Sequence, residues 1–395
     1  MKILHATPLY APAWQYGGPV RSTHQVTMAL VEQGHEVVVV TTSTGTPHEG
    51  AAGPVHDDVD GVRVVYCPAR AARVGILSPE MAAEVCRLAP DTNVAHLTGV
   101  WQPSMIGVQR ALRAAGVPYV TSPRGALSPY SFTRGYVKKR LYYRLFERRI
   151  ERQAAAIHVT APIEQHELEA LSLAVPIDVI PNSCDANAWF EDRVAAGSWR
   201  MARGIGDAEC VFMHAGRTHH KKNLEFLLRA AAGLPPAAEW RVVLLGPVAD
   251  RDRQYLEHLR TLLPQNRLVV DPGSGDPGEL RAAYSAADVM TIPSLHENFC
   301  NVVIESILCR TPVLSSPHVG ASQLCESLGG VTIVPLDRTA WAAELMKFMR
   351  PQCRSRLVPD VREAIAKRFS REAVGSAFES LYRRVAGRTR SVAGP

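Results

Sequence analysis

Short apolar runs alternate with helical patterns along nearly the whole chain, and this alternation limits the possible folds more than any other feature. Chains that alternate in this way fold as strands joined by crossover helices, which gives a parallel sheet covered on both faces. The expected strands form two series, at 3–6, 37–41, 62–66, 94–97, 117–121, 156–160 and 177–180, and at 211–214, 241–245, 268–270, 289–292, 313–315 and 331–334. The sequence therefore predicts an α/β fold with two Rossmann-like, doubly wound domains.

The two series divide the 395-residue chain into two expected domains. We expect a first domain at 1–182, a less periodic linker at 183–206 and a second domain at 207–369. Two such domains are expected to face a cleft, and ligands of these sheets bind beyond the carboxyl ends of the strands. The loops that follow expected strands are therefore the places to look for functional residues.

The cysteine and charge content excludes several classes of protein. Eight cysteines are scattered without a Cys-x-x-Cys pair, which argues against a disulfide framework or a zinc site and favours the cytoplasm. No apolar run approaches the ~18 residues of a membrane-spanning helix, and the first apolar stretch is too short for a signal peptide. We therefore expect a cytoplasmic protein.

The excess of basic over acidic residues is confined to one segment of the chain. Lysine and arginine outnumber aspartate and glutamate by 44 to 38, and the segment 134–152, with eight basic residues against two glutamates, accounts for the whole difference of +6. Its basic residues are Arg134, Lys138, Lys139, Arg140, Arg144, Arg148, Arg149 and Arg152. Such a patch favours an anionic surface over nucleic acid, so we expect no nucleic-acid partner.

Four arginines of this segment recur every four residues and would form one ridge of a helix. They are Arg140, Arg144, Arg148 and Arg152. A ridge roughly opposite would consist of Tyr142, Phe146 and Ile150. The pattern predicts a helix docked on the protein with its basic ridge at an anionic membrane surface, where each cation contributes about 1 kcal/mol. An ordinary solvated face is the alternative.

The stretch 293–314 holds two glutamates, Glu297 and Glu305, eight residues apart between two expected strands. The first glutamate lies in a loop and the second lies in the helix that this loop opens. Backbone N–H groups at a helix start attract phosphate, and a carboxylate can accept hydrogen bonds from sugar hydroxyls. The stretch therefore predicts a nucleotide-sugar site.

A second candidate segment, 216–223, follows the strand expected at 211–214. Arg217, Lys221 and Lys222 come just before an expected helix, and cations at a helix start make a clamp for a diphosphate. The alternative is a solvated basic turn, which the two glutamates in the same half of the chain make less attractive.

Three loops of the first half also follow expected strands. One carries the glycine pair Gly17 and Gly18, which allow close approach of a ligand to the backbone. The others carry His96, which could line a sugar pocket, and Arg124, which would face the cleft. The alternatives are a plain tight turn, a packed core histidine and a surface arginine.

Two Asp-x-Asp triplets, at 58–60 and 250–252, could hold Mg²⁺ or Mn²⁺ under a diphosphate. The first lies in a turn before Gly61, and the second opens a helix, where aspartate is a favoured cap. We interpret both as structural and predict no metal and no cofactor.

These motifs resemble the retaining GT-B glycosyltransferases of glycosyltransferase family 4, over nearly the whole chain. The resemblance rests on the Glu-x7-Glu motif from Glu297 to Glu305, on the segment from Gly216 to Asn223 and on the Gly-Gly-Pro loop from Gly17. The linker sequence PNSCDANAWF adds to it, and SPRGALSP followed by KKRLYYRLFERR resembles bacterial members that build surface polysaccharides.

The resemblance implies roles for the matched residues of the second domain. Arg217 and Lys222 would neutralise the donor diphosphate as it leaves, and Glu305 would accept hydrogen bonds from the ribose. Glu297 would hold the donor sugar. The remaining donor-binding positions would be Gly216, Asn298, Phe299, Cys300 and Asn301.

For the first domain, the resemblance places Gly17, Gly18 and the segments around His96 and Arg124 on the acceptor side. A final helix at 370–388 would cross back onto this domain. Many members have histidine where this chain has Arg124, which weakens any claim that a histidine at that position assists the reaction. Cys300 stands where glycine is common, and a thiol at a helix start can have a lowered pKa, so we expect a reactive thiol that nucleotide protects.

The chain is thus expected to be a metal-independent, retaining hexosyltransferase. It would move a sugar from a UDP-, GDP- or dTDP-sugar to a glycan or polyprenyl-linked acceptor in surface-polysaccharide synthesis, in the cytoplasm with peripheral attachment at the inner membrane face. Retention is usually explained by attack on the leaving-group side, with a diphosphate oxygen taking the acceptor proton.

There are two alternative functions. A nucleotide-sugar epimerase or phosphorylase could share the architecture, and product analysis with donor alone would reveal it. A non-catalytic glycan-binding scaffold would retain neither the diphosphate cations nor both glutamates, and it would bind no nucleoside diphosphate.

Overall fold

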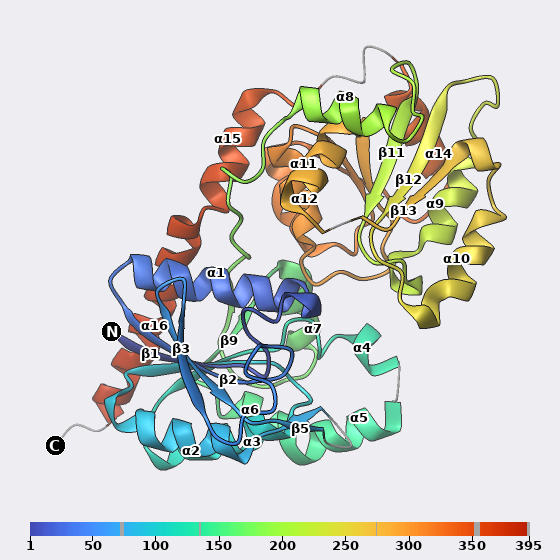
Figure 1. Cartoon of the computed structure of the whole chain (residues 1–395). Coiled ribbons are helices and arrows are strands. Elements are labelled where there is room, and N and C mark those ends of the chain that lie inside the picture. The colour runs from blue at the N-terminus through green and yellow to red at the C-terminus, as the bar shows by residue number, and fades with distance from the viewer. Residues whose placement is uncertain (72–74, 134–135, 274, 351–355, 393–395) are drawn as a thin grey trace. The chain divides into compact units, whose positions relative to one another are not determined.

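The computed structural model describes every residue except 72–74, 134–135, 274, 351–355 and 393–395 (Figure 1). Arg134 of the basic segment therefore lies outside the described residues. The chain divides into two compact units. The first unit comprises Met1–Ser183 with Arg371–Pro395, and the second comprises Cys184–Ser370.

The first unit is built on an eight-stranded sheet with the strand order β10-β9-β8-β7-β1-β2-β4-β3. Its strands are β1 (Lys2–Ala6), β2 (Glu36–Thr42), β3 (Val55–Val59), β4 (Val62–Cys67), β7 (Val94–Thr98), β8 (Tyr119–Ser122), β9 (Ala156–Val159) and β10 (Ile177–Val179). A separate hairpin pairs β5 (Arg70–Ala71) with β6 (Ile76–Leu77). Every strand pair of the large sheet is parallel except β3 with β4.

Helices cover both faces of this sheet (Figure 1). They are η1 (Trp14–Tyr16), α1 (Gly18–Glu32), α2 (Pro79–Leu88), η2 (Ala89–Asp91), α3 (Pro103–Ala114), α4 (Pro129–Thr133), α5 (Tyr136–Tyr142), the π-helical turn η3 (Tyr143–Glu147), α6 (Arg148–Arg152), α7 (Pro162–Glu169) and α16 (Arg371–Val392). Neighbouring residues of β1 belong to different cores, since Ile3 packs with α1 and α16 whereas Leu4 packs with α2 and α3. The all-apolar strands are therefore explained by burial on both faces.

The last helix, α16, packs on the first unit although it ends the chain. Val374, Phe378 and Tyr382 are buried in the same core as Val26 and Leu30 of α1. The expectation that the final helix returns to the first domain is therefore confirmed.

The second unit holds a six-stranded parallel sheet with the order β13-β12-β11-β14-β15-β16. Its strands are β11 (Cys210–Ala215), β12 (Trp240–Leu245), β13 (Leu268–Asp271), β14 (Val289–Ile292), β15 (Val313–Ser315) and β16 (Val331–Ile333). The strand order reverses between β11 and β14. In open parallel sheets such a reversal opens a crevice at the carboxyl ends of the two strands, which is the usual place for a ligand.

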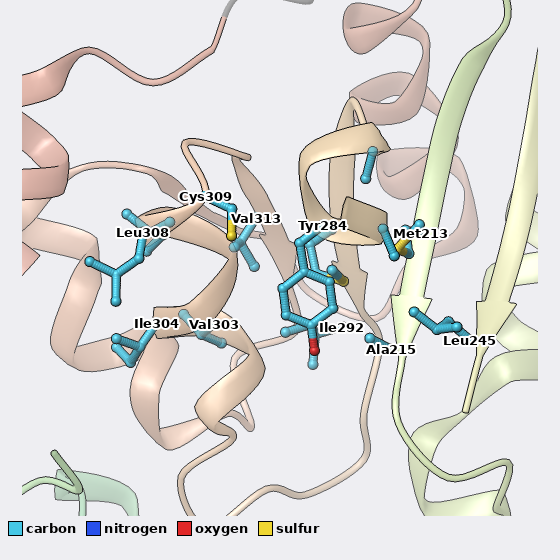
Figure 2. Packing of buried hydrophobic residues seen from close by; sticks show 14 of the residues in the cluster. Met213, Ala215, Leu245, Tyr284, Ile292, Val303, Ile304, Leu308, Cys309 and Val313 are labelled. Atoms are coloured by element: carbon cyan, nitrogen blue, oxygen red, sulfur yellow. The ribbon is translucent and has the colours of Figure 1, made fainter. Parts of the chain in front are cut away.

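The helices of the second unit are α8 (Arg193–Met201), η4 (His220–Lys222), α9 (Leu224–Ala231), η5 (Asp250–Asp252), α10 (Arg253–Arg260), η6 (Gln265–Arg267), α11 (Pro277–Ala286), α12 (Asn301–Leu308), α13 (Gly320–Cys325), η7 (Glu326–Leu328), α14 (Arg338–Phe348) and α15 (Pro359–Arg368). Figure 2 shows Tyr284 of α11 between Met213 of β11 and Val303 of α12 in one of the two cores that flank the sheet. This packing fixes the start of α12 relative to the end of β11.

The predicted fold class is confirmed, and the differences have physical reasons. Strand β3 was missed because it is a largely exposed, antiparallel edge strand and so lacks an apolar run. Residues 184–206, expected as a linker, belong to the second unit, where Ala196 and Trp199 of α8 are buried in its core.

Candidate active site

Two loops meet at the reversal point of the second sheet. The loop after β11 carries Gly216 and Arg217 and then η4, and the loop after β14 leads through Glu297 into α12. The loops are joined by hydrogen bonds, because Asn223 Nδ2 donates to the Pro293 carbonyl at 3.1 Å and the Leu295 N–H donates to the Lys221 carbonyl at 2.9 Å. The sequence therefore folds both candidate segments into one site.

Lys222 and Glu297 form an ion pair at the centre of this site. The Lys222 Nζ lies 3.0 Å from the Glu297 Oε1, and the two side chains are only 18% and 14% exposed. Burial alone would lower the pKa of Lys222, but the Glu297 carboxylate outweighs it and the pKa is raised. Burial likewise opposes ionisation of Glu297, and Lys222 reverses the effect, so that its pKa is lowered. Both groups are therefore charged at neutral pH.

The backbone of Glu297 is fixed from the other side by the segment after β15. The Glu297 N–H donates to the His318 carbonyl at 2.8 Å, and the Glu297 carbonyl accepts from the Gly320 N–H at 3.1 Å. The carboxylate is thus presented from a rigid loop, as a ligand-holding group requires.

Glu305 lies in the second turn of α12 and is partly buried. The Tyr284 hydroxyl donates to Glu305 Oε2 at 3.3 Å, and the Tyr284 ring stacks on Trp189 with centroids 5.3 Å apart. Sequence reasoning found Glu305 but missed these two aromatic supports, which come from α11 and from the segment expected as a linker.

The backbones of Gly216 and Gly246 approach each other closely next to this site. A Cβ atom added at Gly246 would lie 2.3 Å from the Gly216 carbonyl oxygen, and both residues have strongly positive φ angles, 138° and 143°. Gly246 was missed in the sequence. The available signal was that it follows the apolar run of β12 in the way that Gly216 follows β11.

Arg217 is exposed, and Asn298, Cys300 and Asn301 are partly exposed at the start of α12. Phe299 is buried, with its ring 6.2 Å from that of Phe369. Their donor-binding roles stay predictions.

Cys300 caps α12 in a left-handed conformation, with φ of 80°. This explains why glycine suits the position. Burial raises the pKa of the Cys300 thiol to about 12, against a smaller lowering by Lys222. The expected low pKa is therefore wrong, because loss of solvent outweighs the helix start.

In the first unit, His96 is fully buried on β7. Its Nδ1 pairs with the Tyr382 hydroxyl and its Nε2 with the Ser122 hydroxyl, both at 2.5 Å. Burial lowers the pKa of His96 well below its usual value. This imidazole is a core group with both nitrogens occupied, so the sugar-lining contact expected of it is not available here.

Arg124 has a left-handed backbone, with φ of 54°, and its guanidinium donates to Asn182 Oδ1 at 2.7 Å. Burial lowers its pKa. It is thus part of the structure of the first unit and not a free surface arginine. Gly17 and Gly18 lie where η1 meets α1, and a Cβ atom added at either would meet no atom within 4 Å.

The basic segment forms α5, η3 and α6, so the single expected helix contains a π-helical turn. Arg140, Arg144, Arg148 and Arg152 are all exposed. The two glutamates of the segment turn inward instead, and burial raises the pKa of Glu147 to about 7 and that of Glu151 to about 8. The exposed face of the segment therefore carries the arginines, whereas its two glutamates are buried.

Apolar side chains are exposed on the same segment. Val137 is 76% exposed, and Leu141 and Leu145 are each 57% exposed. Of the expected docking ridge, Ile150 is buried, but Phe146, which lies within the π-helical turn, is 37% exposed. The exposed leucines were not predicted.

Two absences concern only the described part of the chain. No helix there combines the length and apolar content needed to cross a membrane. The same residues include no group of three or more histidine, cysteine or acidic side chains that could hold a metal ion. The lack of a metal requirement stays a prediction.

Comparison with known proteins agrees with this geometry. Residues 17–183 match the family described as Glycosyl transferase 4-like domain, and residues 198–367 match that described as Glycosyl transferases group 1. A D-inositol 3-phosphate glycosyltransferase of Xylanimonas cellulosilytica is 26% identical over 417 residues, covering 97% of this chain and 95% of that protein. An uncharacterized glycosyltransferase of Methanocaldococcus jannaschii is 29% identical over 167 residues, so that this chain spans 42% of that protein.

Solved structures share the fold. Sucrose-phosphate synthase from Thermosynechococcus elongatus superposes with a TM-score of 0.77 at 20% identity, covering 98% of this chain and 100% of that one. Anabaena HepE in complex with UDP and glucose gives a TM-score of 0.72 at 17% identity, covering 96% and 99%.

Fold and relatives define the chain as a GT-B glycosyltransferase. It belongs to the glycosyltransferases of the family-4 type, as the motifs around Glu297 and Lys222 had indicated.

Proposed function

We propose that the protein is a retaining hexosyltransferase that uses a nucleotide-sugar donor and needs no metal ion. The observation that carries the proposal is the buried Lys222–Glu297 ion pair at the strand-order reversal, next to the start of α12. Lys222 and the exposed Arg217 would supply the positive charge that a diphosphate leaving group requires, and this charge makes a divalent cation unnecessary.

The donor would lie with its ribose at Glu305 and its sugar at Glu297. A carboxylate accepts hydrogen bonds only, so it suits hydroxyl groups. The Tyr284 hydroxyl already donates to Glu305, which fixes the orientation of that carboxylate before ribose binds. The backbone at Asn298, Cys300 and Asn301 would hold the sugar and the adjoining phosphate at the start of α12.

In the proposed reaction the bond between the anomeric carbon and the diphosphate oxygen breaks while the acceptor oxygen bonds to the same face of that carbon. The acceptor proton passes to the departing diphosphate oxygen. The chain supplies charge stabilisation and positioning, and no side chain acts as a nucleophile.

UDP is the donor nucleotide to test first, with GDP and dTDP as alternatives. Anabaena HepE, which shares the fold, was solved with UDP and with UDP-glucose. Because a ligand raises stability by RT ln(1 + [L]/Kd), a thermal-shift series with UDP-, GDP- and dTDP-sugars ranks the donors directly. Protection by none of them would contradict the proposal and favour a scaffold.

The acceptor we propose is a glycan, free or polyprenyl-linked, at the inner membrane face during surface-polysaccharide synthesis. The support is the outer face of α5, η3 and α6, where exposed cations surround Leu141 and Leu145. Leucines can enter the lipid interface while arginines contact anionic headgroups. Vesicles with and without anionic lipid, tested with Arg144→Glu and with Arg193→Glu as an exposed control in the second unit, check this contact.

The stereochemical outcome can be measured without knowing the acceptor. Slow transfer to water releases the donor sugar, and proton NMR recorded before mutarotation identifies its anomer. A released sugar with the donor configuration supports retention, and the opposite anomer contradicts it. Conversion of the nucleotide sugar into an epimer, with no release, would identify an epimerase.

A further inference from the structure

His214 on β11 is a buried histidine with one nitrogen bonded and the other turned to the site. It is 1% exposed, and its Nδ1 lies 2.9 Å from the Thr291 carbonyl oxygen of the neighbouring strand β14. A carbonyl only accepts, so Nδ1 carries the proton. In the neutral ring this leaves a lone pair on Nε2.

The Nε2 atom has no hydrogen-bond partner among the described residues, although it is buried. It faces the small space above Gly216. A Cβ atom built there would lie 3.7 Å from His214 Nε2 and 3.5 Å from the Lys222 Nζ, so both nitrogens border the same space. A buried acceptor without a partner is costly, and such atoms are expected where function requires them.

The charge state of His214 fits a place beside a lysine. Burial and, to a smaller extent, Lys222 lower its pKa to about 4, against smaller opposing effects of the Thr291 carbonyl and of Glu297. The imidazole is therefore neutral at pH 7, and its Nε2 is the negative end of the ring dipole. A protonated histidine would instead compete with Lys222 for Glu297.

We infer that His214 is a positioning residue for Lys222: its Nε2 lone pair, which borders the same space as the Lys222 Nζ, would accept a hydrogen bond from the ammonium group when the donor binds, while Glu297 keeps its ion pair with that group. The inference rests on the proposed function, in which Lys222 meets the diphosphate. An ammonium has three N–H groups, so two acceptors on the protein leave one for a phosphate oxygen. A cation fixed before the reaction stabilises the leaving group without reorganisation.

Two amide substitutions test the roles of the two ring nitrogens of His214 separately. In His214→Gln the amide can place its oxygen where Nε2 stood, whereas in His214→Asn it can only replace Nδ1. We expect His214→Gln to retain most of kcat, and His214→Asn to lose about tenfold in kcat with little change in donor KM, as for a misplaced charge. Equal kcat in the two variants, or a better His214→Asn, would overturn the inference.

A readout independent of sugar transfer keeps the two proposals apart. Acylation of Lys222 by an amine reagent, measured against pH by peptide mass spectrometry with Lys221 as the internal control, reports the Lys222 pKa. We expect His214→Asn to lower this pKa relative to His214→Gln. If that difference appears but wild-type protein transfers no sugar, the positioning stands and the proposed function fails. The absence of any difference overturns the positioning.

The wild-type protein also tests the inference if neither variant folds. Nitrogen NMR of histidine-labelled protein distinguishes protonated from unprotonated ring nitrogens. One buried imidazole of the second unit must carry its proton on Nδ1 at pH 7. A proton on Nε2 of His214 would overturn the inference.

Discussion

His96 and His158 of the first unit and His214 of the second are buried strand histidines that are bonded in different ways. In the first unit, His96 and His158 bond to Ser122 from opposite sides, at 2.5 Å and 2.6 Å, and the outer nitrogens bond to Tyr382 and to the Ile180 carbonyl. In the second unit, His214 bonds on one side only. Both ring nitrogens of His96 and of His158 are thus bonded within the core, whereas His214 has one buried nitrogen without a hydrogen-bond partner.

The residues around His96 and His158, and those around His214, explain the difference. Phe378 and Tyr382 of α16 pack over the first cluster, with Phe378 4.7 Å from the His158 ring between centroids. In the second unit, the space beside His214 Nε2 is bordered by Gly216, which has no side chain, and by the charged end of Lys222. The following predictions test this contrast, starting with the largest effect.

Lys222→Ala is expected to lower transferase activity by at least about 100-fold, the scale for loss of one charge-stabilising group. The neighbouring Lys221→Ala, which removes a cation other than the one paired with Glu297, serves as the matched control and should stay within about threefold. Steady-state rates of the folded variants decide the matter. Near-normal activity of Lys222→Ala would contradict the assignment of the active site to this part of the second unit.

His96→Leu is expected to cost about 2 kcal/mol in the free energy of unfolding, because the buried Tyr382 hydroxyl loses its partner. UDP binding should be unchanged, since His96 belongs to the core of the first unit. Urea denaturation measures the cost, with the exposed His56→Leu as a control. A stable variant that loses activity would show that His96 acts on a substrate after all.

The first unit should lose stability in acid. Unfolded imidazoles bind protons below pH 6.5, whereas burial lowers the pKa of His5 and of His158 to about 3. The unfolded chain then binds more protons, so the free energy of unfolding falls as pH drops from 6.5 towards 3.

This fall should be shallower in His96→Leu, which has one such imidazole fewer. The buried acids Glu147 and Glu151, whose raised pKa values act in the opposite direction, are common to both proteins and cancel in the comparison. Parallel pH profiles of wild type and variant would contradict the closed histidine cluster.

The smallest effect concerns Cys300. Since burial raises the pKa of its thiol to about 12, a thiol reagent at neutral pH should modify it more slowly than the exposed Cys86. Mass spectrometry of the labelled peptides gives both rates in one sample. Faster modification of Cys300 than of Cys86 would contradict this prediction and would indicate an activated thiol at the start of α12.

Much of the fold could be predicted because strands buried on both faces leave uninterrupted apolar runs in the sequence. The second unit's site could be found for a similar reason. Lys222 and Glu297 each lie shortly after such a run, and the ends of β11 and β14 are adjacent in the sheet.

The buried, fully bonded state of His96 could not be predicted in this way. Its partner Tyr382 lies 286 residues further along the chain, on a helix that returns to the first unit. The π-helical turn of the basic segment and the left-handed Cys300 were also missed, because both depend on packing that the local sequence does not encode. His214 was passed over as one residue of an apolar strand.

The central claim is that Lys222, held in place by its ion pair with Glu297, binds the diphosphate of a nucleotide. Calorimetric titration of UDP into wild-type protein, Lys222→Ala and Lys221→Ala tests it most directly. We predict binding at least about tenfold weaker in Lys222→Ala, a loss of about 1.4 kcal/mol, with Lys221→Ala close to wild type. Equal affinity of all three proteins for UDP would contradict the claim.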